Sequence, residues 1–162
     1  MDLITDRTSR DVARWEMLRN KGWNCMTEME RREWLGEILP TPAASKGMYT
    51  HNDLNRVEGV VKTLIVRLKA MGYKVPDLVV KTDWTHRDTV WSDDMARYYS
   101  NIETLRNVLT VYPSTPEAPK VDKKLDFNTA NDIEQILLDI CSLLAKQSKS
   151  WYYVGEIFTG EV

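Results

Sequence analysis

Four side chains of this 162-residue chain could bind a transition metal through nitrogen or sulfur. They are its two histidines and its two cysteines, His51, His86, Cys25 and Cys141. Zinc sites take such ligands from closely spaced pairs along the chain. No pair here has that spacing, so we predict no metal site and no cofactor. The separation of the cysteines also favours two thiols over a structural disulfide.

Residues for catalysis are equally hard to assign. A nucleophile needs a neighbouring base, and the chain contains neither a G-x-S-x-G nor an S-x-x-K arrangement. The adjacent carboxylates Asp93 and Asp94 fall at an expected helix start, where the helix dipole favours them. No glycine-rich loop of the phosphate-binding type occurs. We therefore expect a protein that is not an enzyme.

Tryptophan offers a third kind of chemistry, because an exposed aromatic face can stack on a sugar ring. Of six tryptophans, Trp84 and Trp151 are the least well explained by core positions, and they form a candidate ligand platform. Aromatic residues are also typical of contact surfaces between proteins, and several of them lie near the C-terminus of this chain. The candidate partner-docking residues are Trp151, Tyr152, Tyr153, Ile157 and Phe158.

Composition excludes several classes of partner. The 22 basic and 24 acidic residues are interspersed and leave a formal net charge of -2, so no basic surface for nucleic acid is predicted. The most apolar run, residues 60–68, contains Lys62 and Arg67 and is too short to span a membrane. The first residues lack the pattern of a secretory signal. We expect a protein made in the cytoplasm without membrane insertion.

One heptad seam defines the elements that would position these residues. It consists of Leu54, Val57, Val61, Leu64 and Leu68, and apolar or aromatic residues recur with the same spacing 41 and 76 positions later. The later seams are Met95, Tyr98, Ile102, Leu105, Leu109 and Ala130, Ile133, Leu137, Ile140, Leu144. Residues so spaced share one helix face, which predicts a three-helix core over residues 49–150. The spacing permits association within one chain or between chains.

Polar residues follow the same offset of 76 positions. Asn131 and Glu134 match Asn55 and Glu58, and Asp126 matches the predicted helix cap Thr50. The repeat therefore extends beyond the hydrophobic pattern.

The N-terminal region is predicted to form a helical hairpin over residues 1–39. Thr8 and Thr27 each precede an acidic residue at the spacing of a capping box, and Gly22 lies between the two expected helices. Pro40 and Pro42 then predict an extended linker over residues 40–48. Within the first seam helix, Gly59 suggests a close approach of another backbone.

Two segments are predicted to be extended. Residues 78–80 are β-branched or aliphatic and predict a short strand, and Ser92 is the expected cap of the helix that follows. Residues 151–162 are aromatic and β-branched, with two glycines, and predict an extended C-terminal segment that needs a partner. The predicted fold is mainly α: an N-terminal helical hairpin plus a three-helix bundle, with a short extended or β C-terminal segment.

Several short phrases resemble a known family. They are Thr5-Asp6-Arg7-Thr8 with Asp11-Val12, Lys21-Gly22-Trp23 with Met26-Thr27, Glu33-Trp34-Leu35, Tyr49-Thr50 with Asp53-Leu54-Asn55-Arg56-Val57-Glu58, Lys81-Thr82-Asp83-Trp84-Thr85, Ala130-Asn131-Asp132-Ile133-Glu134, and Gly155-Glu156-Ile157 with Gly160-Glu161. In their order, they resemble small tail-associated structural proteins, and modules of tail-fibre proteins, of phages and prophages of Gram-positive bacteria. In similar sequences a short glycine-rich connection replaces residues 40–47.

The resemblance implies a virion component of the tail tip, baseplate or tail fibre, and it implies no activity. We expect a phage or phage-tail-like particle protein that docks on other tail proteins and is present as a homo-oligomer or in several copies. Three alternatives remain: an adhesin that binds cell-wall polysaccharide, an assembly chaperone for a tail fibre, and an enzyme without a recognisable motif.

Overall fold

The computed structural model describes the backbone of residues 3–157 and the side chains of residues 3–149. Its helices are α1 (Ser9–Lys21), α2 (Glu28–Trp34), α3 (His51–Ala70), α4 (Ser92–Val108) and α5 (Phe127–Ile157), with two short 3-10 helices, η1 (Trp23–Cys25) and η2 (Ala44–Lys46). The prediction of a mainly helical chain is confirmed, and residues 3–157 contain no β-strand. Within this range, no helix is long and apolar enough to cross a membrane.

Helix starts follow the predicted capping residues with one exception. The predicted capping boxes at Thr8 and Thr27 are present, and the predicted cap Thr50 also forms a capping box, with Asp53. Asp126 precedes α5 and accepts a hydrogen bond from the Thr129 amide at 2.8 Å. The prediction for Ser92 was wrong, because Ser92 is already helical. The residue before α4 is Trp91, whose amide donates to the Asp94 carboxylate at 3.1 Å.

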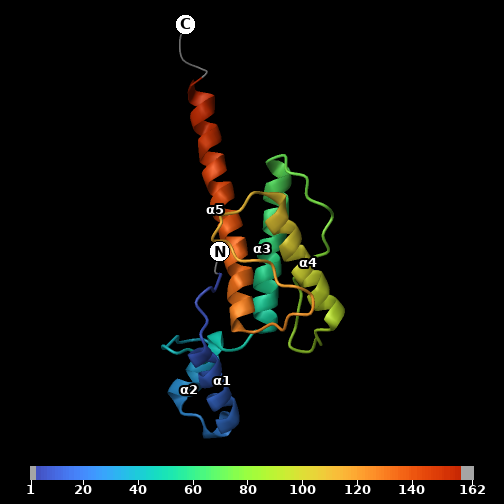
Figure 1. Cartoon of the computed structure of the whole chain (residues 1–162). Helices are drawn as coiled ribbons and strands as arrows, with labels where there is room; N and C mark the ends of the chain where they lie inside the picture. The colour runs from blue at the N-terminus through green and yellow to red at the C-terminus, as the bar shows by residue number, and fades with distance from the viewer. Residues whose placement is uncertain (1–2, 158–162) are drawn as a thin grey trace.

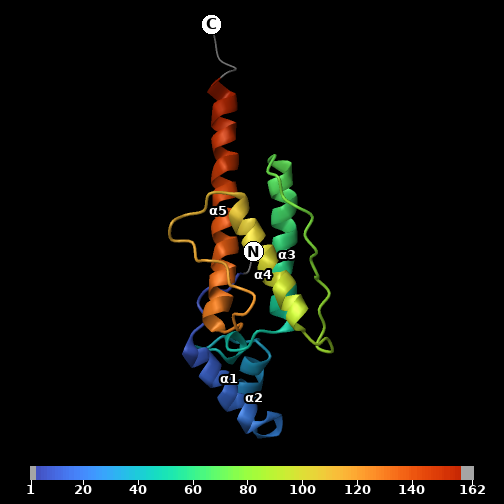
Figure 2. The same ribbon diagram turned by 45° about the vertical axis from the view of Figure 1, so that its right-hand side comes forward.

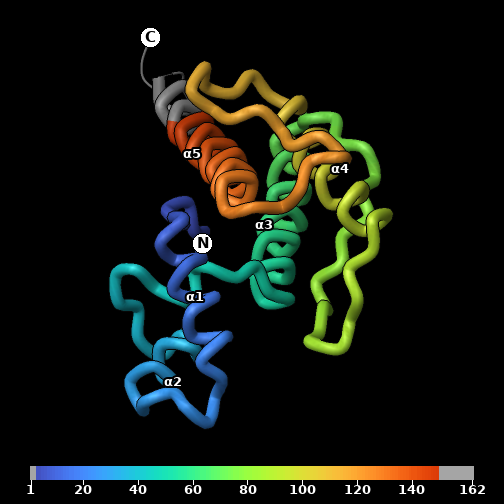
Figure 3. The backbone as a smooth tube through the Cα atoms, turned by 60° about the horizontal axis from the view of Figure 1, so that its bottom comes forward, coloured from blue at the N-terminus to red at the C-terminus, as the bar shows by residue number. Residues whose placement is uncertain are grey.

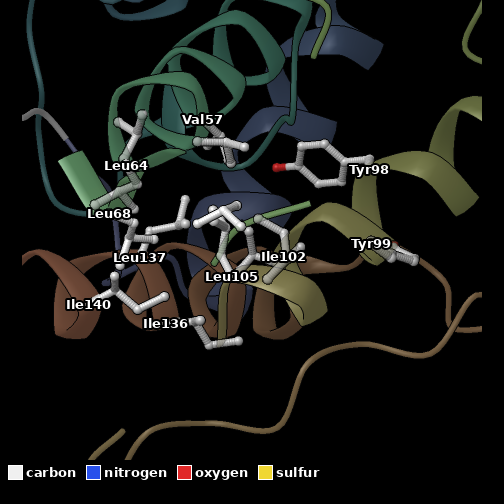
Figure 4. Close-up of a cluster of buried hydrophobic side chains, with 14 of the residues drawn as sticks. Val57, Leu64, Leu68, Tyr98, Tyr99, Ile102, Leu105, Ile136, Leu137 and Ile140 are labelled. Carbon is white, nitrogen blue, oxygen red and sulfur yellow. The ribbon is translucent and has the colours of Figure 1, made fainter. Parts of the chain in front are cut away.

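Helices α3, α4 and α5 pack side by side around one hydrophobic core (Figure 1, Figure 2). All three seams face this core. Met95 and Leu109 are half-buried against it, and the other seam residues are buried. Figure 4 shows side chains from the three helices meeting in the interior. Large apolar side chains removed from water in this way contribute roughly 1.5 to 3 kcal/mol each.

Helices α1 and α2 form a smaller unit beside the ends of α3 and α5 (Figure 1, Figure 3). Its own apolar cluster contains the buried Leu18, Met26 and Ala44. The rings of Trp15 and Trp34 stack beside this cluster, with centroids 6.3 Å apart and planes at 12°. Two short helices thus bury their apolar faces mainly on one another and on η2.

The stretch predicted as an extended linker, residues 40–48, packs against α1 through η2. The Ala43 amide donates to Asp11 Oδ1 at 2.7 Å, and the Ala44 amide donates to Glu33 Oε1 at 3.1 Å. A Cβ on Gly47 would lie 2.2 Å from the Asp11 carbonyl oxygen. Two buried carboxylates therefore hold this stretch in place. The close approach predicted at Gly59 was wrong, since a Cβ there would meet nothing within 4 Å.

Residues 78–80 are extended but do not form the predicted strand. The Val79 carbonyl oxygen bonds to side chains instead of to a neighbouring strand. The Val79 carbonyl oxygen accepts from Asn101 Nδ2 at 2.8 Å and from Arg97 Nη1 at 3.0 Å, both on α4. Side chains of the helical core therefore satisfy this segment where a sheet was expected.

The extended C-terminal segment predicted for residues 151–162 is not confirmed. Helix α5 continues to Ile157, and residues 158–162 lie outside the described part. Once a helix is nucleated, each further residue adds a hydrogen bond, and aromatic residues are only modestly unfavourable there. The 31 residues of α5 make it about 46 Å long, and it projects past the end of α3 (Figure 1, Figure 2).

Candidate functional site

Two buried glutamates organise the polar interior of the core. Glu58 on α3 is 1% exposed and Glu134 on α5 is 0% exposed. Removing a carboxylate from water costs several kcal/mol unless ion pairs and hydrogen bonds replace its hydration. Each glutamate meets that requirement by binding a segment of extended backbone.

Glu58 binds the segment that follows α3. Its Oε2 accepts from the Lys81 amide at 2.7 Å, and its Oε1 accepts from Trp84 Nε1 at 3.1 Å. Arg97 of α4 donates to both oxygens at 2.7 and 2.9 Å, and this bonding raises the pKa of Arg97. One turn earlier, Asn55 accepts from the Trp84 amide and donates to the Trp84 carbonyl, each at 2.8 Å. Residues 81–84 are thereby fixed along α3.

Glu134 binds the N-terminal segment in the same manner. Its Oε2 accepts from the Ile4 amide at 2.5 Å, and its Oε1 lies 2.8 Å from Arg7 Nη2. Arg56 of α3 pairs with both carboxylate oxygens. Asn131 accepts from the Arg7 amide at 3.1 Å and donates to the Arg7 carbonyl at 2.8 Å. Residues 4–7 are thereby fixed along α5.

We define each Asn-x-x-Glu pair as a backbone clamp: the α3 clamp is Asn55 with Glu58, and the α5 clamp is Asn131 with Glu134. A clamp supplies an extended segment with the donors and acceptors that a neighbouring strand would otherwise provide. The two clamps explain why extended segments can pack on this helical core without a sheet.

Further charges and rings surround the α5 clamp. Asp53 lies 3.1 Å from Arg7 and 2.6 Å from Arg56. These two guanidinium groups and the two carboxylates of Asp53 and Glu134 therefore form one network. The Arg7 guanidinium also lies over the ring of Tyr49, 5.3 Å from its centroid. This network joins the N-terminal segment to both α3 and α5.

A third buried carboxylate, Glu33, holds the N-terminal unit together. It accepts from Arg14 at 2.7 Å and from the Ala44 amide, and its side chain is 3% exposed. The hydrogen bond from Arg14 is the main reason that the pKa of Glu33 lies below its ordinary value of 4.5. The Arg14–Glu33 pair therefore couples α1, α2 and η2 in the ionised state.

This pair predicts a specific acid response. A carboxyl whose folded pKa is depressed contributes stability that is present above its unfolded pKa and is lost as the pH falls through the folded pKa. We expect Glu33→Gln to be less stable than the wild type at pH 7, and the difference to shrink as the pH falls below about 4.5. Denaturant unfolding at a series of pH values measures that difference. A difference that is independent of pH would contradict the assignment.

The predicted ligand platform needs a correction at Trp84. This side chain is 4% exposed, its Nε1 bonds to Glu58, and the Lys81 ammonium lies 3.8 Å from the ring centroid. The ring is therefore buried against the α3 clamp and offers no face to a sugar. The side chains of Trp151, Tyr152, Tyr153 and Ile157, and all of Phe158, lie outside the described part.

The two histidines lie close together, although 35 residues separate them in sequence. The ring centroids of His51 and His86 are 6.4 Å apart, and the rings meet edge to face. Cys25 is exposed on η1 and Cys141 is half-buried on α5. Among the described residues, no three metal-ligating side chains gather where an ion could be held.

The Asn-x-x-Glu repeat is visible in the sequence, but by itself it does not indicate which segments the two pairs bind. A second repeat identifies those segments: the pattern Thr-Asp-x-Thr-x-Arg-Asp occurs at residues 5–11 and again at residues 82–88.

Comparisons of this chain with protein-family models, with curated proteins and with solved structures find no match.

Proposed function

We propose that this chain is a structural component of a phage tail or phage-tail-like particle, located at the tail tip, baseplate or fibre. The observation that carries the proposal is the projection of α5 beyond the core (Figure 1). Its distal part contains the aromatic residues from Trp151 onward and the phrase Gly155-Glu156-Ile157, which is one of those that resemble the tail-associated family. In this proposal, an N-terminal hairpin and a three-helix core form a rigid base for a docking helix.

The mechanism is mechanical rather than catalytic. Large aromatic residues dominate the binding energy of many protein interfaces, which supports the aromatic residues from Trp151 onward as the docking segment. Several copies on one particle would add avidity to a modest single contact. The proposed partners are other tail, baseplate or fibre proteins.

The adhesin alternative is less well supported, because Trp84 is buried and cannot stack on cell-wall polysaccharide. The assembly-chaperone alternative has no structural observation in its favour. It differs from the proposal in one outcome: a chaperone acts during assembly and is absent from finished particles.

Deleting residues 151–162 is expected to leave a folded helical protein that no longer enters particles, since the core side chains lie in residues 54–144. Circular dichroism tests folding, and mass spectrometry of purified particles tests incorporation. Trp91→Ala is the matched control, because this tryptophan is 68% exposed outside the docking segment, and it should be incorporated normally. Normal incorporation of the truncation would reject the docking role. Absence of the wild type from finished particles would favour the chaperone.

A further inference from the structure

The two bound segments are equivalent in sequence and in local structure. In each Thr-Asp-x-Thr-x-Arg-Asp pattern, the second threonine amide donates to the final aspartate, at 2.7 Å for Thr8 and Asp11 and at 2.6 Å for Thr85 and Asp88. The third residue of the pattern is Arg7 in one segment and Trp84 in the other. Both segments therefore present the same backbone shape to a clamp.

The contacts made by the two clamps also correspond. In each case the asparagine bonds to both the amide and the carbonyl of the third pattern residue. The glutamate accepts from the amide three positions earlier and pairs with the side chain of that third residue. An arginine of a neighbouring helix completes each site, Arg56 for Glu134 and Arg97 for Glu58. A clamp thus recognises a main-chain shape and one side chain.

Charge distinguishes the two sites. Among the described residues that pair around the α5 clamp, the carboxylates of Asp53 and Glu134 outnumber the guanidinium of Arg56 by one, which suits the positive third residue Arg7. Around the α3 clamp, Glu58 and Arg97 cancel, and the Lys81 ammonium lies 3.8 Å from the centroid of the bound ring, which suits an uncharged tryptophan. The α5 clamp is therefore selective for the N-terminal pattern, because a buried unpaired charge is strongly unfavourable.

Connectivity is the main difference between the sites. The segment bound by the α3 clamp lies on the connection between α3 and α4, 23 to 29 positions after its partners on α3. The segment bound by the α5 clamp is 124 to 130 positions away from its partners on α5. None of the clamp contacts depends on a covalent connection between segment and helix, so an identical segment from another copy can make the same bonds. Exchange of an identical element between protomers is a low-cost route to assembly.

We propose that the α5 clamp is an exchangeable docking site, and that in an assembly it binds the N-terminal segment, residues 3–11, of a second copy of this chain. The contact joins a clamp on one copy to a segment on the next, so it is head-to-tail and can be repeated. The inference rests on the clamp geometry and is independent of the proposed tail function, since its test uses only the purified chain.

A full-length Arg7→Glu variant tests the site, because its own segment carries a carboxylate that Asp53 and Glu134 repel. A fluorescent peptide of residues 3–11 should bind this variant saturably in an anisotropy titration. The same peptide carrying Arg7→Glu should bind at least about tenfold more weakly, a difference of roughly 1.4 kcal/mol. A chain carrying Arg7→Glu with Glu134→Gln should also lose binding. Circular dichroism verifies folding, and Arg7→Ala replaces the first variant if that variant is unfolded.

Mixing two variants tests exchange between copies. One is the Arg7→Glu chain, whose clamp is intact, and the other is Asn131→Ala with Glu134→Gln, whose segment is intact. Each alone should have the monomer mass of 18.8 kDa, whereas the mixture should form a 1:1 complex of twice that mass in light scattering. Asp6→Asn is the matched control in the segment, since within residues 3–149 the Asp6 side chain bonds only to Lys46 at the surface, and it should not change peptide binding. A folded Arg7→Glu chain that ignores the peptide, or a mixture that stays at 18.8 kDa, would overturn the proposal.

Discussion

Replacing Glu134 with alanine is expected to lower the free energy of unfolding by about 3 to 5 kcal/mol. The carboxylate is fully buried and pairs with Arg7 and Arg56. Among the described residues, its removal leaves both guanidinium groups with Asp53 as their shared carboxylate, and it deprives the Ile4 amide of its acceptor. Chemical denaturation followed by circular dichroism measures the loss directly.

Glu37→Ala is the control for this substitution. Glu37 pairs with Arg32 at 3.3 Å, but both side chains are about half exposed, so the expected loss is below about 1 kcal/mol. Glu134→Gln keeps the shape of the side chain and removes its charge. Its loss of unfolding free energy should lie between those of Glu134→Ala and Glu37→Ala. A loss for Glu134→Ala no larger than that for Glu37→Ala would show that the network does not hold the N-terminal segment.

Leu137→Ala is expected to destabilise the chain by about 2 to 5 kcal/mol, because it opens a cavity in the core shared by three helices. Leu137 is 0% exposed and points into the cluster drawn in Figure 4. The neighbouring Leu138 is 38% exposed on the same helix. Leu138→Ala makes the same chemical change on the same helix. Because Leu138 is partly exposed, the loss of unfolding free energy should be well under half of that for Leu137→Ala.

The difference between these two variants isolates burial from every other property of leucine. Both melting temperature and denaturant midpoint should fall strongly for Leu137→Ala and only slightly for Leu138→Ala. Equal losses would mean that the third seam is not the face of α5 that packs against α3 and α4.

The heptad seams could be predicted from sequence because helix packing is periodic. Leu64 in the first seam and Leu137 in the third each belong to a series with alternating spacings of three and four residues, which a helix places on one face. The capping residue Thr50 marks where the first core helix starts. Such signals are local, so a single sequence contains them in full. The mainly helical fold followed from them.

The linker and the strand were misread because their partners are distant in sequence. Residues 40–48 were predicted as a spacer from their prolines, but Asp11 and Glu33 bind the backbone at Ala43 and Ala44. Residues 78–80 have strand-like composition, and side chains of α4 satisfy the Val79 carbonyl in place of a strand. Periodicity reports which residues are apolar, and it does not report which buried carboxylate or amide will bind a backbone.

Trp84 illustrates the same limit for the candidate site. An isolated tryptophan in a polar loop suggests an exposed ring that could stack on a ligand. Its burial depends on Glu58, 26 positions earlier, which accepts from its indole nitrogen. The repeated Thr-Asp-x-Thr-x-Arg-Asp pattern, paired with the repeated Asn-x-x-Glu, is the signal that would have indicated a shared structural role.

The central claim is that polar side chains on α3 and α5 hold two extended segments by their backbones. Amide hydrogen exchange tests it residue by residue. The clamps bind the amides at the two ends of residues 4–7 and of residues 81–84. These are Ile4 and Arg7 in one stretch and Lys81 and Trp84 in the other.

The two intervening amides of each segment, at residues 5–6 and 82–83, have no acceptor among the described residues. The structure therefore predicts slow, fast, fast, slow exchange in both segments when it is measured by NMR. Uniformly fast exchange across residues 4–7 and 81–84 would contradict the claim.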